Sequence, residues 1–284
     1  MRRAVCLIAL TWLLVLLPVS AVAYELLILQ SSSSPVYDQV LKGLRSTQQF
    51  SERLLVVSQY AEVDLQRIIR EERPLAILAL GDTALALAAT VRRVPVVALM
   101  AADLRSYSQH ENITGVDVLA APERFFQAFQ QLRARRVGLV GSPTKSGAYM
   151  RRMQHTAQRY GLELVLREVR SGREVQAQLQ GLQGRVDALW LLPDTTALTR
   201  DTVDLFFRFS LEQRVPVVAF ANAYLAAGAA VALEVDRRDI GVQGALLLQQ
   251  VMRGEAPGEV AVVSTRRAVI RMNQAVLGNL GLSP

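Results

Sequence analysis

The stretch Val94-Pro95-Val96-Val97-Ala98 occurs a second time, letter for letter, at Val215-Pro216-Val217-Val218-Ala219 in this chain of 284 residues. Each copy is a short apolar run rich in β-branched side chains, which is typical of a buried strand. Single residues upstream of the two copies also recur, all at one constant offset: Ser34 with Ser146, Tyr37 with Tyr149, Arg73 with Arg185, Asp82 with Asp194 and Thr83 with Thr195. The two halves of the chain therefore repeat one structural unit.

Short apolar runs alternate with amphipathic segments of helical length around these landmarks. In the first half we predict strands over 26–29, 54–57, 75–80 and 94–99, and helices over 35–49, 63–72 and 82–91. In the second half we predict strands over 137–140, 163–168, 188–192 and 215–220, and helices over 148–160, 173–182 and 196–213, the last one lengthened by the extra residues before Val215. This alternation predicts an α/β protein with two similar, doubly wound parallel-sheet lobes joined by a hinge.

The composition excludes several classes of protein. The chain is 51% hydrophobic and 20% charged, which is ordinary for a globular protein and excludes a wholly disordered chain. It holds one cysteine, Cys6, and two histidines, His110 and His155, so multi-cysteine zinc sites and a disulfide framework are excluded. We expect no metal and no cofactor. The net charge is +7, but the arginine pairs are scattered along the chain, so a nucleic-acid partner is not favoured.

The first 23 residues have the pattern of an export signal. Arg2 and Arg3 precede an apolar run over 4–17, and Ala21-Val22-Ala23 supplies the small residues of a cleavage site. We expect cleavage after Ala23 and a periplasmic protein; an uncleaved membrane anchor is the alternative, because 4–23 is long enough to span a bilayer. Cys6 does not stand at a cleavage point, so a lipoprotein is not expected.

Polar residues gather where the predicted strands end and the helices begin. In a parallel sheet this edge binds ligands, because helix N-termini offer unpaired N–H groups there. Two such edges facing each other would enclose a small molecule. Asp82 and Asp194, one from each half, could neutralise a ligand ammonium, and serine and threonine could hold a carboxylate. The same residue types also cap helices without any ligand, which is the competing interpretation.

Aromatic side chains near this edge are less decisive. Tyr37 and Tyr149 fall in the first turn of their helices, where they would either stack on a ligand or pack half-buried. Trp190 lies within a strand and is predicted to be core. Asn222, Tyr224 and Asp103 follow strands and are weaker candidates.

Motifs of enzymes are absent or incomplete. The segment 141–147, Gly-Ser-Pro-Thr-Lys-Ser-Gly, lacks the order of a phosphate-binding loop, and no G-x-S-x-G or G-x-G-x-x-G follows a strand. Neither His110 nor His155 has a metal-ligating partner at helical spacing. We therefore expect a binding protein and not an enzyme.

The order of the short motifs resembles one known family. Gly81-Asp82-Thr83-Ala84, Val94-Pro95-Val96-Val97 and Asn112-Ile113-Thr114-Gly115-Val116 follow the family's order, as do Asp187-Ala188-Leu189, Pro193-Asp194-Thr195 and, in the tail, a helix opened by Gly241 and the run 252–257. Together they resemble the ABC-transporter substrate-binding proteins of the type I periplasmic-binding fold, whose better-known members bind aromatic amino acids.

The resemblance implies capture of a small solute in the periplasm, delivery to an ABC permease in the inner membrane, and a three-stranded hinge. It implies one lobe over 24–117 with 237–263 and another over 118–236 with 264–284, in a protein expected to be a monomer. With the tyrosines and Asn222, the expected ligand-binding residues are Ser32, Ser33, Gly81, Asp82, Thr83, Ser142, Asp194, Thr195, Tyr37, Tyr149 and Asn222.

The chain departs from the family at the expected cleft. Asp82 stands where the family usually has threonine, and Ala101-Ala102-Asp103-Leu104 replaces a common Asp-Pro, so the ligand class stays open. A periplasmic sensory module and an enzyme on the same scaffold are the alternative functions. The Asp194→Ala variant is expected to weaken ligand binding and leave the fold intact.

Overall fold

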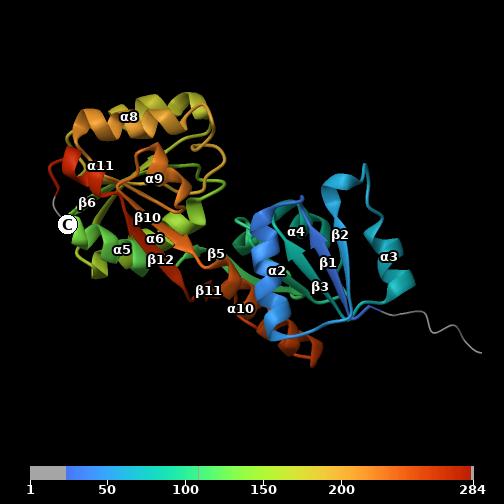
Figure 1. The fold of residues 1–284 in the computed structure, drawn as a ribbon. Coiled ribbons are helices and arrows are strands. Elements are labelled where there is room, and N and C mark those ends of the chain that lie inside the picture. The colour runs from blue at the N-terminus through green and yellow to red at the C-terminus, as the bar shows by residue number, and fades with distance from the viewer. Residues whose placement is uncertain (1–23, 108, 283–284) are drawn as a thin grey trace, which may run out of the picture.

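Two six-stranded sheets form two lobes, which lie side by side in the computed structural model (Figure 1). The structure describes residues 24–107 and 109–282, so the expected signal sequence over 1–23 lies outside the described residues. In the described part of the chain, no helix has both the length and the apolar character needed to cross a membrane.

The first sheet is parallel throughout and has the strand order β11-β5-β4-β3-β1-β2. Its strands are β1 (Leu26–Gln30), β2 (Glu52–Val56), β3 (Ala76–Leu80), β4 (Val96–Leu99), β5 (Ile113–Ala120) and β11 (Val263–Thr265). Residues of β1 and β3 alternate between two apolar cores, one on each face of the sheet. Burial on both faces explains why these strands read as unbroken apolar runs.

The second sheet has the order β12-β10-β9-β8-β6-β7, and only the pairing of β10 with β12 is antiparallel among the described strands. Its strands are β6 (Arg136–Gly141), β7 (Glu163–Glu168), β8 (Ala188–Trp190), β9 (Val217–Ala219), β10 (Val231–Val235) and β12 (Ala268–Met272). Trp190 is core, as predicted: it is 1% exposed and packs against Phe125, Phe126 and Phe129.

The two sheets share one topology over their first five strands, so the predicted α/β fold with two similar lobes is confirmed. The likeness extends to single hydrogen bonds. The N–H of Ile77 donates to the carbonyl of Pro95 at 2.8 Å, and in the second lobe the N–H of Leu189 donates to the carbonyl of Pro216 at 2.9 Å. The repeated Val-Pro stretch therefore enters β4 and β9 in the same way.

Helices cover both faces of each sheet. On the first sheet, α2 (Pro35–Thr47) and α10 (Arg237–Met252) pack on one face, and α3 (Leu65–Glu72) and α4 (Asp82–Ala88) pack on the other. On the second, α5 (Pro122–Gln131), α6 (Gly147–Arg159) and α11 (Gln274–Asn279) oppose α7 (Val175–Gln180) and α8 (Val203–Gln213). The short helix α9 (Ala223–Ala227) follows β9, and three single turns, η1 (Val57–Gln59), η2 (Leu104–Tyr107) and η3 (Gly172–Glu174), complete the described elements.

The pair α2 and α10 requires glycine where the two helices meet. A Cβ added to Gly43 would lie 2.0 Å from the carbonyl oxygen of Arg238, and one added to Gly241 would lie 1.9 Å from that of Val40. Backbone contact at this distance leaves no room for any side chain. Gly241 therefore serves helix packing and does not open the helix as expected: α10 begins four residues earlier, where the side chain of Asp236 accepts from the N–H groups of Arg238 and Asp239.

A second helix boundary was also predicted wrongly. The helix expected over 196–213 begins at Val203, because the preceding segment folds into turns around two side chains. Asp194 accepts from the N–H groups of Thr196 and Ala197, and the hydroxyl of Thr202 donates to the carbonyl of Ala197 at 2.7 Å. These side-chain bonds compete with a helical backbone, and they take up part of the extra length that the sequence assigned to a helix.

The chain passes between the two sheets three times within the described residues, from β5 to α5, from β10 to α10 and from β11 to β12. Strand β5 itself joins the lobes: Val116 packs in the first-lobe core and Ala120 in the second-lobe core. Figure 1 shows β5 and β11, which form one edge of the first sheet, in the middle of the molecule beside the second lobe.

Candidate ligand-binding site

A cavity of about 70 Å³ lies between the lobes, and it is lined from both sides. The first lobe contributes the beginning of α4 and the segment after β4; the second contributes the beginning of α6 and the segment after β8. Its lining residues are Asp82, Ala102, Asp103, Leu119, Lys145, Ser146, Tyr149, Leu192, Pro193 and Thr195. We call it the inter-lobe cavity. A second cavity of about 130 Å³ adjoins it and shares Asp103, Leu119, Lys145 and Tyr149.

The first-lobe wall is built around Gly81, the residue before α4. Gly81 has a φ of 89°, a conformation that favours glycine. A Cβ there would lie 2.2 Å from the Tyr37 hydroxyl and 2.8 Å from the hydroxyl oxygen of Ser31. The Ser31 hydroxyl also accepts from the N–H of Ala84 at 2.9 Å, which holds the first turn of α4 against β1. Tyr37 is thus half-buried over this turn, and burial raises the pKa of its phenol.

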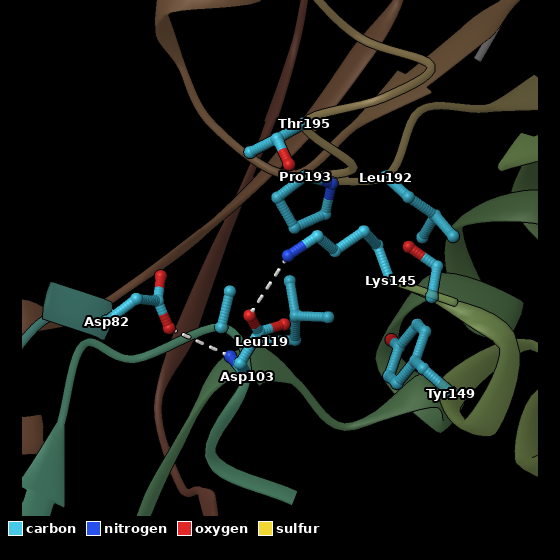
Figure 2. Close-up of a pocket in the computed structure, with 10 residues that line it drawn as sticks. Asp82, Asp103, Leu119, Lys145, Tyr149, Leu192, Pro193 and Thr195 are labelled. Atoms are coloured by element: carbon cyan, nitrogen blue, oxygen red, sulfur yellow. Dashed lines mark hydrogen bonds and ion pairs between the residues drawn. The ribbon is translucent and has the colours of Figure 1, made fainter. Parts of the chain in front are cut away.

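Asp82 and Asp103 form the acidic side of the inter-lobe cavity. The N–H of Asp103 donates to the Asp82 carboxylate at 2.9 Å, so the two segments are tied together. Desolvation raises the pKa of the Asp82 carboxyl, and the nearby charge of Asp103 raises it further, against the opposing effects of backbone N–H groups and Lys145. Lys145 reaches Asp103 from the other lobe, with its ammonium nitrogen 3.5 Å from the carboxylate (Figure 2).

Asp194 organises the second-lobe wall from below the surface. It is 2% exposed, and its carboxylate accepts four hydrogen bonds: from the N–H of Ser142 at 2.7 Å, the hydroxyl of Ser146 at 2.6 Å, and the N–H groups of Thr196 and Ala197, both at 2.9 Å. It therefore joins the loop after β6 to the loop after β8. A carboxylate so fully engaged acts on a ligand through the loops it positions.

Tyr149 is the most unusual side chain at the cavity. Its hydroxyl oxygen is buried and has no hydrogen-bond partner among the described residues. Burial raises the pKa of this phenol strongly, so it is a neutral donor. Its ring packs beside Trp190 and under the Arg152 guanidinium, which lies 5.2 Å from the ring centroid. Figure 2 shows Tyr149 on the second-lobe side of the site, across from Asp82.

The structure brings together some of the residues predicted from the sequence and separates others. Asp82, Tyr149 and Thr195 line the inter-lobe cavity, while Ser142 and Asp194 are buried beneath it. Ser32, Ser33, Gly81, Thr83, Tyr37 and Asn222 are not among the lining residues of this cavity or its neighbour. Asn222 precedes α9, and the oxygen of its side-chain amide is buried without a hydrogen-bond partner among the described residues.

Two charged lining residues are not among the ligand-binding residues expected from the sequence. Asp103 is there only a weaker candidate, and Lys145 is there only part of the incomplete phosphate-loop pattern. Both stand in segments that directly follow a strand, after β4 and β6. That position was the available signal, and Lys145 is one of only two lysines in the chain.

Comparison with known proteins identifies the family. A family model described as ABC transporter substrate binding protein matches residues 41–283. The chain belongs to this family. No curated protein matches the chain.

Solved structures of similar fold agree with this family. A conserved domain protein from Vibrio cholerae is 19% identical with a TM-score of 0.65, covering 92% of this chain and 95% of its own. The ABC domain from Streptococcus pneumonia, in complex with L-Trp, is 18% identical with a TM-score of 0.65, covering 91% and 94%. A ligand-free, open substrate-binding protein with adhesive properties from Clostridium difficile is 16% identical with a TM-score of 0.66, covering 92% and 96%. At these sequence identities the likeness concerns the fold alone. The fold of this family member is the two-lobed fold of periplasmic binding proteins.

Proposed function

We propose that the protein is the periplasmic solute-binding component of an ABC importer and that it captures a small polar solute between its lobes without catalysis. The observation that carries this proposal is the inter-lobe cavity, lined from both lobes by loops at the carboxyl ends of parallel strands. Membership of a substrate-binding family supports it. Export through a cleaved signal over 1–23 and delivery to an inner-membrane permease by a monomer belong to the same proposal.

Binding operates by closure of the two lobes about the three crossing segments, with lobe boundaries near 24–117 with 237–263 and 118–236 with 264–284. A solute that contacts both walls gains its full set of contacts only when the lobes approach, and this difference shifts the equilibrium towards the closed form. The crossing strand β5 offers a pivot: Asp117 on it pairs with Arg105 of the first lobe and lies 3.8 Å from Arg152 of the second.

The expected ligand contacts follow from the cavity. Asp82 and Thr195 contact the solute from opposite lobes, and the Tyr149 hydroxyl donates to it. Ser142 and Asp194 support the second-lobe loops. Ser32, Ser33, Gly81, Thr83, Tyr37 and Asn222 would reach a solute only after the lobes have moved, and they remain candidates for the closed form.

Native mass spectrometry of gently purified protein tests the proposal. The protein is expected to carry a small molecule of defined mass, which denaturation releases and which raises the melting temperature when it is added back. A protein that carries nothing, and that no amino acid, purine or sugar stabilises, would contradict a solute-binding role. Co-purification with a permease from solubilised membranes supports import, whereas co-purification with a membrane receptor kinase instead would assign the same cleft to sensing.

A further inference from the structure

The acidic side of the inter-lobe cavity is only partly neutralised. Asp82 and Asp103 stand on the first-lobe wall, and Lys145 is the single cation among the described residues that line this cavity. In the adjoining cavity the further charges are Arg105 and Asp117, which pair with each other. One negative charge at Asp82 and Asp103 is therefore left without a cationic partner among the described residues that line the two cavities.

The ion pair that Lys145 makes with Asp103 is weak. Its ammonium is 3.5 Å from the Asp103 carboxylate, long for an ion pair, and its side chain is 47% exposed. The two cavities share both of these residues, so the ion pair stands in the space that would join them. A lysine ammonium on a flexible stem can leave such a position at small cost, because partly exposed ion pairs contribute little.

An independent observation indicates that this space is built for an occupant. Tyr149 lines both cavities, and its hydroxyl is buried without a hydrogen-bond partner in the described part of the chain. An unsatisfied buried hydroxyl costs stability, and an acceptor atom on a bound solute would remove that cost. The space thus offers two carboxylates to a cation and one phenol to an acceptor.

We propose, given the solute-binding function, that Asp82 and Asp103 form a subsite for a cationic nitrogen of the solute, an ammonium or a guanidinium, and that Lys145 fills this subsite as an internal counter-ion when no solute is bound. The incoming cation displaces Lys145 from Asp103. The solute class that follows is a small organic cation that also bears an acceptor for Tyr149.

Calorimetric titration with charge-matched pairs tests the solute class. The pairs are 4-amino-1-butanol with 1,4-butanediol, putrescine with 1,4-butanediol, and butylguanidine with butylurea, because the second member of each pair carries no cationic nitrogen. At least one cation is expected to bind ten-fold or more tightly than its neutral partner. If no cation outcompetes its neutral partner, the cationic subsite is refuted. A neutral solute that binds alone refutes the subsite and leaves the proposed function standing; binding of nothing, with no released solute, refutes both.

Substitutions then test the role of Lys145 with the best cation as the probe. Lys145→Met is expected to tighten binding of the cation about two- to five-fold. This is the change in affinity that corresponds to the free energy of an exposed ion pair, which the solute no longer has to break. Weaker binding in that variant would mean that Lys145 contacts the solute directly, and would overturn the counter-ion role. Lys42→Met, which removes the other lysine from the exposed face of α2, is the matched control and should change nothing.

Asp103→Asn is expected to change the affinity for the cation in the opposite direction. It is expected to weaken binding of the cation ten-fold or more and to leave binding of the neutral partner unchanged. Asp204→Asn, an exposed position on α8, is its control. Equal losses for the cation and its neutral partner in Asp103→Asn would show a structural effect and refute the subsite. An unchanged melting temperature confirms that the variant is folded.

Discussion

Replacing Asp194 by alanine should destabilise the second lobe, and the reason lies in what its carboxylate holds. From the sequence, this change was expected to weaken ligand binding without touching the fold. The structure places the carboxylate at 2% exposure, with four hydrogen bonds from Ser142, Ser146, Thr196 and Ala197. Alanine at this position leaves all four donors without that acceptor.

The magnitude follows from how many of those donors stay out of water. Ser142 is 5% exposed and Ala197 is 1% exposed, so two N–H groups become buried and unpaired, at about 1–3 kcal/mol each. Water can reach the half-buried Thr196 and Ser146 and replace part of what they lose. We therefore expect a loss of about 3 kcal/mol in the free energy of unfolding, which corresponds to roughly 5 °C in melting temperature for a chain of this size.

Urea denaturation followed by circular dichroism measures this change, and the repeat supplies a matched control. Asp82 occupies the equivalent sequence position in the first lobe, but it is exposed, and the N–H of Asp103 that donates to its carboxylate can turn to water when the carboxylate is removed. Asp82→Ala should lower the stability by less than about 1 kcal/mol. If Asp194→Ala unfolds within about 1 kcal/mol of the unaltered protein, or if the two variants behave alike, the carboxylate does not organise the two loops and the reasoning fails.

Three further changes test other parts of the structure. Gly241→Ala should lower the free energy of unfolding by about 1–3 kcal/mol, because the added methyl group overpacks α2 against α10; urea denaturation measures this loss. Gly278→Ala is the control and should cause no loss, because a Cβ there meets open space. Equal effects of the two substitutions would refute the close approach of α2 and α10. Tyr149→Phe should leave the melting temperature unchanged or higher and lower the affinity for the solute, and a clear fall in melting temperature would mean that the hydroxyl has a partner. Burial alone would raise the pKa of Asp187, but hydrogen bonds from the Arg136 side chain and backbone and from a neighbouring N–H outweigh it and hold this pKa below the usual range. Asp187 therefore stabilises the fold above its unfolded pKa of about 4 and loses this effect as the pH falls through the lower folded value. Asp187→Asn should lower the melting temperature at pH 7, and the difference from the unaltered protein should shrink as the pH falls below about 4. A pH-independent difference would contradict this.

Local pattern predicted the first four strands of each sheet and most helices, because burial on both faces gives those strands unbroken apolar runs, but it did not predict β5, β10, β11 and β12. Strands β1 and β3 are unbroken apolar runs whose residues alternate between two cores, and apolar residues of the covering helices pack in the same two cores. The errors fall where side chains compete with the backbone, as Asp194 and Thr202 do ahead of α8. Such competition depends on contacts across the fold, so a local pattern does not record it.

The repeat predicted which residues occupy equivalent positions, but not that two of them have diverged. Asp82 begins a helix at the surface, whereas Asp194 is buried beneath two loops. The reason is a partner: Asp194 meets Ser142 and Ser146, which follow β6, and the first lobe has no such pair of donors at Asp82 among its described contacts. Equal spacing in a sequence places residues on equal elements and says nothing of what packs against them.

The sequence by itself determined the fold class, the internal repeat, the polar residues that follow the strands, and the resemblance to a substrate-binding family. All of these depend on burial and strand order, which short-range periodicity and repetition encode. Only the tertiary structure decided that Asp103 meets Lys145 across the lobes, that the Tyr149 hydroxyl is buried without a partner, and that Asp194 supports the loops from beneath. These depend on distances between segments far apart in the chain. The packing of helices and loops within the second lobe sets those at Asp194 and Tyr149, and the packing of one lobe against the other sets the distance between Asp103 and Lys145.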